Sequence, residues 1–316
     1  MKRISLISLL LLFRRPQKAR NRRRASRLQS ESLETRQVLT MLTPVSIAAG
    51  AISTSVDVHD FDGDGIKDIA TLNPATSQVT MLLGNGDGSF RSGPSSSAGG
   101  SGSKMSVSDF DHDGKLDIVT CQGYTIDLLK GNGDGSFQLP RPYVVGPYAN
   151  DIEIGDFNHD GYDDVVTASF SYGGTTEIFI NDGLGSFHPG HNMSIGPNGL
   201  EIEVADVDGD GHEDLLQSGG GGVVGILRGR GDGTFYSGAW ANLGYSNFEM
   251  KADDFDNDGK DDVIVTDGNS VHYYHGNGEL TFQNGRTYSA AGASKLQLAD
   301  VNGDGSVDAA DIAAFI

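Results

Sequence analysis

Aspartate residues recur in this sequence with a spacing that suits a divalent cation. The pattern Asp-x-Asp/Asn-x-Asp-Gly-x-x-Asp occurs six times, and its first residues are Asp60, Asp109, Asp156, Asp206, Asp254 and Asp300. Side-chain oxygens at positions 1, 3 and 5 of such a loop can converge on one point. The glycine at position 6 permits a sharp turn, and the carbonyl of position 7 and the carboxylate of position 9 complete a cage of oxygens.

Calcium is the expected ion in these loops. Two bare carboxylates about 4 Å apart repel by about 4 kcal/mol at an effective dielectric constant near 20, and a cation reverses that sign. Calcium accepts about six to eight oxygens in flexible geometry, whereas magnesium demands a stricter one. A single copy could be an ordinary turn, because Asp and Gly favour turns, but six copies with the ligand positions kept favour a metal site.

The pattern therefore predicts about five to six bound calcium ions. The predicted ligands of the first five loops are Asp60, Asp62, Asp64, Ile66 and Asp68; Asp109, Asp111, Asp113, Lys115 and Asp117; Asp156, Asn158, Asp160, Tyr162 and Asp164; Asp206, Asp208, Asp210, His212 and Asp214; and Asp254, Asp256, Asp258, Lys260 and Asp262. Those of the sixth are Asp300, Asn302, Asp304, Ser306, Asp308 and Asp311.

The sixth loop departs from the others after position 9. Asp311 stands at position 12, where an EF-hand places its last acidic ligand. The residues from Asp308 to Ile316 predict the start of a helix. This segment resembles the first half of a type I dockerin, which would make a cohesin a partner. A degenerate relic, a fragment, or an ordinary loop of the repeat are the alternatives.

A second, glycine-rich motif keeps the same period. It ends in a phenylalanine 28–31 residues after the first Asp of each of the first five loops, and the copies span residues 84–90, 131–137, 181–187, 229–235 and 276–282. Glycine tolerates positive φ, and the phenylalanine can fix the turn to a core, so the motif predicts a tight hairpin.

Short β-branched runs surround both motifs, for example residues 55–58, 68–72 and 79–83. Four such strands recur every 46–50 residues, without a helical period before residue 308. One sheet of this kind cannot bury both faces alone, so radial stacking into a β-propeller of about five to six four-stranded blades is the expected fold. Residues 42–49 match an outer strand and could close the ring.

The repeats resemble FG-GAP-like (VCBS-type) repeats, which are related to the blades of integrin α-subunits. The resemblance covers roughly residues 50–308 and rests on the acidic loops and the glycine-rich turns. It implies a β-propeller with calcium-binding loops. A Gly-Ala-Pro element is missing, so the resemblance does not extend to integrin-type ligand recognition.

The charge of the chain divides it into unlike parts. Residues 1–36 hold 11 Lys and Arg against 2 Asp and Glu, whereas the remainder has a net charge of −29. The apolar run Ile4–Phe13 is too short to span a bilayer but suits an export signal. We therefore expect an export signal and basic leader over residues 1–40, the propeller over 41–299 and the EF-hand-like half segment over 300–316. The protein is expected outside a bacterial cell or on its surface.

The remaining residues favour a binding module over an enzyme. A net charge of −20 argues against nucleic-acid partners, and the single cysteine, Cys121, is expected to be a buried, inert thiol. Familiar catalytic motifs are missing, and the spacing of His272 and His275 does not predict a zinc site. An extracellular protein or polysaccharide is the expected partner, with exposed aromatic residues as contacts: Tyr143, Tyr148, Tyr172, Trp240 and Tyr245. A part in a polysaccharide-degrading system and a structural surface-layer component are the alternatives.

Overall fold

The computed structural model describes residues 53–169, 175–194, 201–219, 222–236, 238–244, 249–290 and 296. The chain divides into two compact units, Met1–Ala48 and Ala49–Ile316, and the described residues belong to the second. All regular secondary structure in this part of the chain is β-strand. The predicted leader, the closing segment 42–49, the sixth loop with its helix, and Tyr172 and Tyr245 lie outside the described residues.

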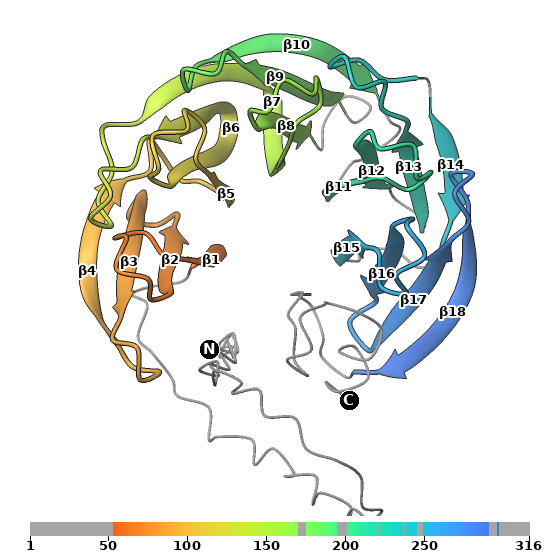
Figure 1. Cartoon of the computed structure of the whole chain (residues 1–316), viewed down its shortest axis with the longest axis horizontal. Helices are drawn as coiled ribbons and strands as arrows, with labels where there is room; N and C mark the ends of the chain where they lie inside the picture. The colour runs from red at the N-terminus through yellow and green to blue at the C-terminus, as the bar shows by residue number, and fades with distance from the viewer. Residues whose placement is uncertain are drawn as a thin grey trace, which may run out of the picture. The chain divides into compact units, whose positions relative to one another are not determined.

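The strands form five repeating units of four extended segments, which we call blades 1 to 5 (Figure 1). Blade 1 consists of β1 (Ser55–His59), β2 (Asp68–Asn73), β3 (Gln78–Gly84) and β4 (Phe90–Ser97). Blade 4 consists of β11 (Ile202–Ala205), β12 (Asp214–Gly219), β13 (Val223–Leu227) and β14 (Ala239–Asn242). Blade 5 consists of β15 (Glu249–Asp253), β16 (Asp262–Thr266), β17 (Ser270–Gly276) and β18 (Phe282–Ser289).

Blades 2 and 3 share one six-membered sheet because two of its strands are long. These strands are β5 (Lys104–Ser108), β6 (Asp117–Leu129), β7 (Arg141–Gly155), β8 (Asp164–Ser169), β9 (Thr175–Asn181) and β10 (Phe187–Ser194). The first half of β6 pairs with β5 and its second half pairs with the start of β7. The end of β7 pairs with β8. Each half of β6 and β7 thus acts as one of the four strands of a blade.

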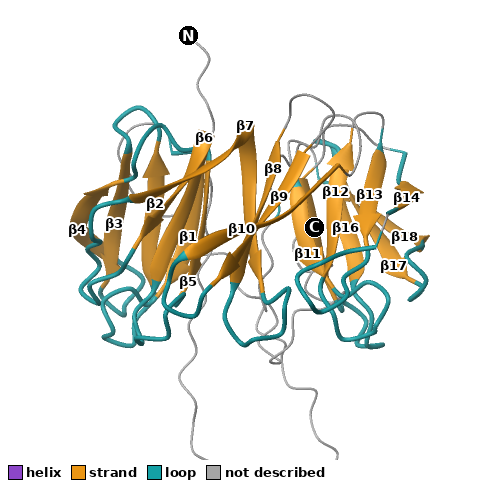
Figure 2. Ribbon diagram, turned by 90° about the horizontal axis from the view of Figure 1, so that it is seen from above, coloured by secondary structure: helices purple, strands orange, loops and turns teal. Residues whose placement is uncertain are grey.

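The first strand of each blade contacts the first strand of the next. These contacts run from β1 to β5, from β5 to β7, from β7 to β11 and from β11 to β15. In Figure 1 these strands lie nearest the middle, with β4, β10, β14 and β18 outermost. Figure 2 shows the strands of the successive blades standing side by side with loops at their ends. This arrangement confirms the expected all-β, propeller-like architecture for the described part of the chain.

The apolar core lies between the blades. Because side chains alternate along a strand, each blade sends residues to both of its neighbours. The four core clusters accordingly join blades 1 and 2, 2 and 3, 3 and 4, and 4 and 5. Representative buried residues are Leu72 and Ile118 in the first cluster, Val119 and Phe179 in the second, Ala168 and Leu215 in the third, and Leu216 and Val263 in the fourth.

The two sequence motifs meet within these cores. The aromatic residue at position 2 of one acidic loop packs edge-on against the phenylalanine that ends the glycine-rich turn of the next blade. The ring centroids are 6.1 Å apart for Phe61 and Phe137, and 5.2 Å apart for Phe110 and Phe187. Edge-to-face pairs of this kind add to the stability that burial alone gives. The phenylalanine of the turn therefore fixes a blade to its neighbour as well as to its own sheet.

None of the described helices could cross a membrane, because the described residues contain no helix that is long and apolar enough.

Candidate cation-binding loops

The acidic loops and the glycine-rich turns lie at the same edge of each blade. The acidic loop joins the first strand to the second, and the turn joins the third strand to the fourth. Because neighbouring strands are antiparallel, both connections fall at one end of the sheet. The repeat therefore gathers all five described acidic loops at corresponding ends of successive blades.

The five described loops have the same internal hydrogen bonds. Oδ2 of the aspartate at position 1 accepts the backbone N–H of the position-6 glycine at 2.8–2.9 Å. The side-chain Oδ1 at position 3 accepts the N–H of position 5 at 2.9–3.3 Å. Oδ1 at position 5 accepts the N–H of position 7 at 2.8–3.1 Å. These bonds orient the three side chains within the loop, so less order remains to be imposed when an ion binds.

Carboxylate groups of several loops are close enough to share an ion. Ligand atoms of three residues lie within 4.8 Å of one another in four loops. The groups are Asp60, Asp62 and Asp68; Asp109, Asp111 and Asp113; Asp206, Asp208 and Asp210; and Asp254, Asp256 and Asp258. All of these donors are hard carboxylate oxygens, which is the donor set that calcium takes. The residues present therefore fit the predicted ion in these four loops.

The third loop is less suited to a cation. Its position 3 is Asn158, and the amide Nδ2 of Asn158 donates to Oδ2 of Asp160 at 2.9 Å. This bond turns a donor toward the carboxylate that would bind the ion. No group of three ligand atoms meets the same distance limit among the described residues of this loop.

The aspartate at position 9 joins the two motifs in every blade. Its side chain is buried, and its Oδ1 accepts the backbone N–H of the first residue of the glycine-rich turn at 2.7–2.8 Å. In blades 1, 3 and 4 its Oδ2 also accepts the N–H of position 2 of its own loop. Sequence reasoning assigned this residue to the metal alone. The structure adds a second task, because the same carboxylate holds the loop against the turn.

Glycine begins four of the five turns because the chain passes very close to the acidic loop there. A Cβ atom on Gly131 would lie 2.1 Å from the backbone oxygen of Leu116, and one on Gly229 would lie 2.2 Å from that of Glu213. Blade 3 has Asn181 instead, whose Nδ2 donates to the corresponding backbone oxygen, that of Asp163, at 3.0 Å. The asparagine converts a steric conflict into a hydrogen bond. The expected hairpin is confirmed by the Asn85 and Asn132 turns, whose backbone N–H groups donate to Ser89 and Ser136.

Burial raises the pKa of the position-9 aspartates. The pKa rises to about 6 for Asp117 and to about 7 for Asp164 and Asp214, and neighbouring loop carboxylates contribute to each rise. Burial likewise raises the pKa of Asp68 and Asp262. A carboxylate with little water and several negative neighbours keeps its proton until positive charge arrives. The electrostatics of the loops thus favour a cation.

A basic side chain contacts position 3 in three of the loops. Nζ of Lys130 lies 2.8 Å from the position-3 carboxylate of loop 2, and the Arg228 guanidinium contacts positions 3 and 5 of loop 4. Arg91 lies 3.5 Å from position 3 of loop 1. Loop 3 has the neutral Asn158 at position 3, and the residue equivalent to Lys130 is Ile180. The charge at position 3 and the charge opposite it therefore change together.

His275 takes this place in loop 5, and sequence reasoning missed it. His275 precedes the glycine-rich turn, as Lys130 and Arg228 do, and its Nδ1 lies 2.9 Å from Oδ2 of Asp256 and 3.2 Å from Oδ1 of Asp262. The spacing from His272 carried no signal, because His272 contacts Thr287 and Asp267 instead. The position directly before the turn was the signal that could have identified it.

Acidic loops of adjacent blades touch through positions 4 and 7. The His112 ring stacks on Tyr162 with centroids 4.4 Å apart. In the next pair, Nε2 of His159 lies 2.7 Å from Nδ1 of His212. The expectation that His112 and His159 point into solvent was incomplete, since each ring rests on the following loop.

The acidic loops also mark the boundaries of a known repeat. The family model described as FG-GAP-like repeat matches residues 60–120, 109–167, 156–217 and 254–310, and together these ranges cover more than half of the chain. This chain belongs to the FG-GAP-like repeat family. Each match begins at the first aspartate of an acidic loop. The predicted repeat family is thus confirmed, whereas the sixth, EF-hand-like loop lies outside the described residues.

Solved structures share the fold of this FG-GAP-like chain. A lectin of Agrocybe aegerita that recognises non-reducing terminal N-acetylglucosamine is 20% identical, with 77% of this chain and 67% of that chain covered and a TM-score of 0.53. BBS1N, solved in complex with ARL6DN, is 12% identical over 76% and 69% of the two chains, with a TM-score of 0.56. A protein from Lactobacillus plantarum is 12% identical over 75% and 71%, with a TM-score of 0.52. No curated protein matches the chain.

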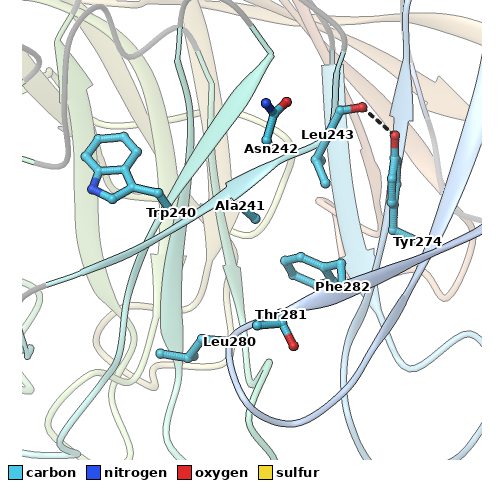
Figure 3. A pocket seen from close by; sticks show the side chains of 8 residues that line it. All are labelled: Trp240, Ala241, Asn242, Leu243, Tyr274, Leu280, Thr281 and Phe282. Atoms are coloured by element: carbon cyan, nitrogen blue, oxygen red, sulfur yellow. Dashed lines mark hydrogen bonds between the residues drawn. The ribbon is translucent and has the colours of Figure 1, made fainter.

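The FG-GAP-like blades leave a shallow hollow between blades 4 and 5. Trp240 on β14, with 55% of its surface exposed, lines this hollow together with Asn242, Leu280, Phe282 and Tyr274. Figure 3 shows Trp240 at one side and Tyr274 at the other, where the Tyr274 hydroxyl donates to the backbone oxygen of Leu243 at 2.6 Å. The hollow has a volume of about 140 Å³. It offers an aromatic face beside polar groups.

The other expected aromatic contacts differ in exposure. Tyr143 packs against Phe187 in the core between blades 2 and 3, with Arg141 over its ring. Tyr148 is exposed, and its ring lies 5.8 Å from that of Tyr124. Of the aromatic residues expected to bind a partner, Trp240 and Tyr148 are therefore the described ones that a partner can reach.

A cluster of charged side chains lies on the first strands of blades 2 to 5. We call it the inner-strand charge cluster, and its members are Lys104, Asp151, Glu153, Glu201, Glu203 and Lys251. Lys104 Nζ lies 2.9 Å from Asp151 and 3.3 Å from Glu201, while Lys251 contacts Glu203 and lies 3.7 Å from Glu153. Burial raises the pKa of the three glutamates. These ion pairs connect blades across the innermost strands.

Cys121 is buried, as expected. Desolvation raises the pKa of its thiol to about 11, and the Ser103 hydroxyl lies 3.3 Å from its sulfur. A thiol with this pKa is not a nucleophile at neutral pH.

Proposed function

We propose that this chain is a non-catalytic binding module that works outside a bacterial cell, with calcium stabilising its loops and a carbohydrate as its ligand. The scaffold part of the proposal rests on the repeated acidic loops. Their carboxylates converge in four loops, the buried position-9 groups have raised pKa values, and the chain carries a net charge of −20. Calcium supplies the positive charge that these groups lack.

The choice of ligand rests on Trp240. A tryptophan that is 55% exposed on an outer strand, beside the Asn242 amide, offers a flat apolar face and a hydrogen-bonding group at the same place. Its cross-strand partner is Gly225, which leaves the indole without side-chain cover from β13. Sugar rings present both C–H faces and hydroxyl groups, so they match this combination. The fold shared with the Agrocybe lectin is compatible with such a role.

The export signal expected over residues 1–40 supports work outside the cell, where calcium is abundant. With a single cysteine, the chain has no intramolecular disulfide to stabilise it. Calcium can take over that task.

Calcium binding is tested by ion counting and by melting. Native mass spectrometry in calcium should find four to six ions per chain, and zero or one would refute the scaffold part. A site occupied at a hundred times its Kd stabilises the fold by about 2.7 kcal/mol. The melting temperature should therefore fall by many degrees when EDTA replaces millimolar calcium, and equal melting temperatures would contradict the proposal.

Carbohydrate binding is tested on a glycan array with two matched variants. Trp240→Ala removes the exposed indole, whereas Tyr124→Ala removes a similarly exposed ring from a different blade. Trp240→Ala should lose binding to any glycan that the unchanged protein retains, and Tyr124→Ala should keep it. Equal retention by both variants would exclude the hollow, and hydrolysis of a bound glycan would contradict the non-catalytic role.

A further inference from the structure

The residue directly before the glycine-rich turn distinguishes blade 5 from the other blades. It lies one residue beyond the pair formed by the third strand and the residue after the position-9 aspartate. The residues at this place in blades 1 to 5 are Leu83, Lys130, Ile180, Arg228 and His275. Only the last of these five can donate a nitrogen lone pair to a metal at neutral pH.

The imidazole of His275 points its Nδ1 atom at two carboxylates. Nδ1 lies 2.9 Å from Oδ2 of Asp256 and 3.2 Å from Oδ1 of Asp262, and the three ligand atoms lie within 4.8 Å of one another. The Nδ1 atom is shielded from solvent, yet it makes no hydrogen bond of acceptable geometry with the described residues. A buried nitrogen this close to two oxygens, without hydrogen-bond geometry, is placed as a ligand rather than as a donor.

The separations fit the bond lengths of a transition metal. Bonds from zinc to nitrogen or oxygen are about 2.0–2.2 Å, so neighbouring ligands around an octahedral or tetrahedral ion lie about 2.8–3.6 Å apart. The separations of 2.9 and 3.2 Å fall in this range. Calcium bonds of about 2.3–2.6 Å require wider spacing, and calcium takes oxygen ligands only.

The carboxylate of Asp262 is held by further bonds. Its Oδ1 accepts the backbone N–H of Gly276 at 2.8 Å, and its Oδ2 accepts the Tyr273 hydroxyl at 2.7 Å. Such outer partners orient ligands and tune their affinity for the metal. The residues at the place of Tyr273 in blades 1 to 4 are apolar: Met81, Leu128, Ile178 and Ile226. Blade 5 therefore carries both an additional ligand and an additional partner for the carboxylate.

We propose that His275, Asp256 and Asp262 form a binding site for a divalent transition metal of the zinc class in blade 5. The inference refines the proposed function, because Asp256 and Asp262 also belong to the predicted calcium loop, but it stands on its own geometry. The site has three protein ligands, and solvent or a ligand donor completes the coordination. Blade 5 thereby differs in metal preference from the oxygen-only loops.

The test uses the full chain saturated with calcium. Zinc chloride is titrated by calorimetry, and Co²⁺ is added separately because its visible absorption reports nitrogen and oxygen ligation. We expect one tight zinc site and a Co²⁺ band. His275→Leu places the blade 1 residue at this position and should weaken zinc binding roughly 100-fold or more and abolish the Co²⁺ band, since loss of an outer partner alone costs roughly 10–100-fold. Tyr273→Phe should weaken zinc binding by that smaller factor.

The matched control is His212→Tyr, which removes a different exposed imidazole pair and places there the residue that blade 3 carries as Tyr162. This variant should keep the tight site. The inference is overturned if His275→Leu binds zinc as the unchanged protein does, or if His212→Tyr removes the tight site. Zinc binding that depends on His275 without any calcium binding would keep the inference and refute the calcium scaffold. Calcium binding with a zinc affinity that is independent of His275 would do the reverse.

Discussion

The close approach of the glycine-rich turn to the acidic loop predicts an unusual order of stability for variants at Gly229. Alanine adds a Cβ that would lie 2.2 Å from the backbone oxygen of Glu213, so the turn must retreat by about 1 Å to reach an ordinary contact. That retreat strains or breaks the 2.7 Å hydrogen bond from the Gly229 N–H to the buried carboxylate of Asp214. Asparagine adds the same Cβ and three more heavy atoms, yet it should be tolerated better.

The magnitude follows from the two lost interactions. A hydrogen bond to a charged group contributes about 1.5–3 kcal/mol, and overpacking costs about 1–3 kcal/mol, so Gly229→Ala should destabilise the fold by about 3–5 kcal/mol. In Gly229→Asn the amide can donate to the Glu213 carbonyl, as Asn181 donates to Asp163 at 3.0 Å in blade 3. We expect that bond to recover about 1 kcal/mol or more.

Urea denaturation followed by circular dichroism, in millimolar calcium, measures these differences. Gly244→Ala serves as the control, because Gly244 has a φ of +79° but no atom within 4 Å of an added Cβ. It should cost about 1–2 kcal/mol, from the left-handed backbone alone. The reasoning is refuted if Gly229→Ala is no less stable than Gly244→Ala, or if Gly229→Asn is less stable than Gly229→Ala.

Three further outcomes follow from the buried groups. Because burial raises the pKa of the glutamates in the inner-strand charge cluster, the folded state holds protons that the unfolded state has released; stability in EDTA should therefore fall as the pH rises from about 6 to 8, and a urea midpoint that rises over this range would contradict it. The Cys121 thiol should resist Ellman's reagent until the protein unfolds, because it is buried and its pKa is raised to about 11; rapid labelling of native protein would count against the core between blades 2 and 3. Phe110→Ala should cost about 3–5 kcal/mol by calorimetry, since Phe110 is fully buried against Phe187, and a loss below about 1 kcal/mol would exclude that contact.

The repeat made much of the fold predictable from the sequence. The acidic loops and glycine-rich turns fixed the period, and alternation in segments such as Asp164–Ser169 identified strands that the structure buries between blades. The sequence could not show that β7 runs unbroken from Arg141 to Gly155 and joins two blades, because no turn signal distinguishes a bend from a continuous strand.

The site was predictable only in part. Ligand positions 1, 3 and 5 follow from a local loop pattern, so they could be read directly. The contact of position 9 with the turn, and that of His275 with Asp256 and Asp262, depend on pairing between strands that are 11 or more residues apart. Pairing of this kind places side chains by register rather than by local spacing, and a pattern search along the chain does not detect it.

The placement of the core between blades has a consequence for how such chains change in length. Within blade 2, Ile118 packs toward blade 1 while its neighbour Val119 packs toward blade 3. Each repeat thus carries both halves of a joint, one to match the repeat before it and one to match the repeat after it. Duplication or loss of a whole repeat preserves matching joints, whereas a cut within a repeat exposes two of them. The natural unit of inheritance in this architecture is therefore the full period of the acidic loops, and propellers of different sizes can arise without any new packing solution.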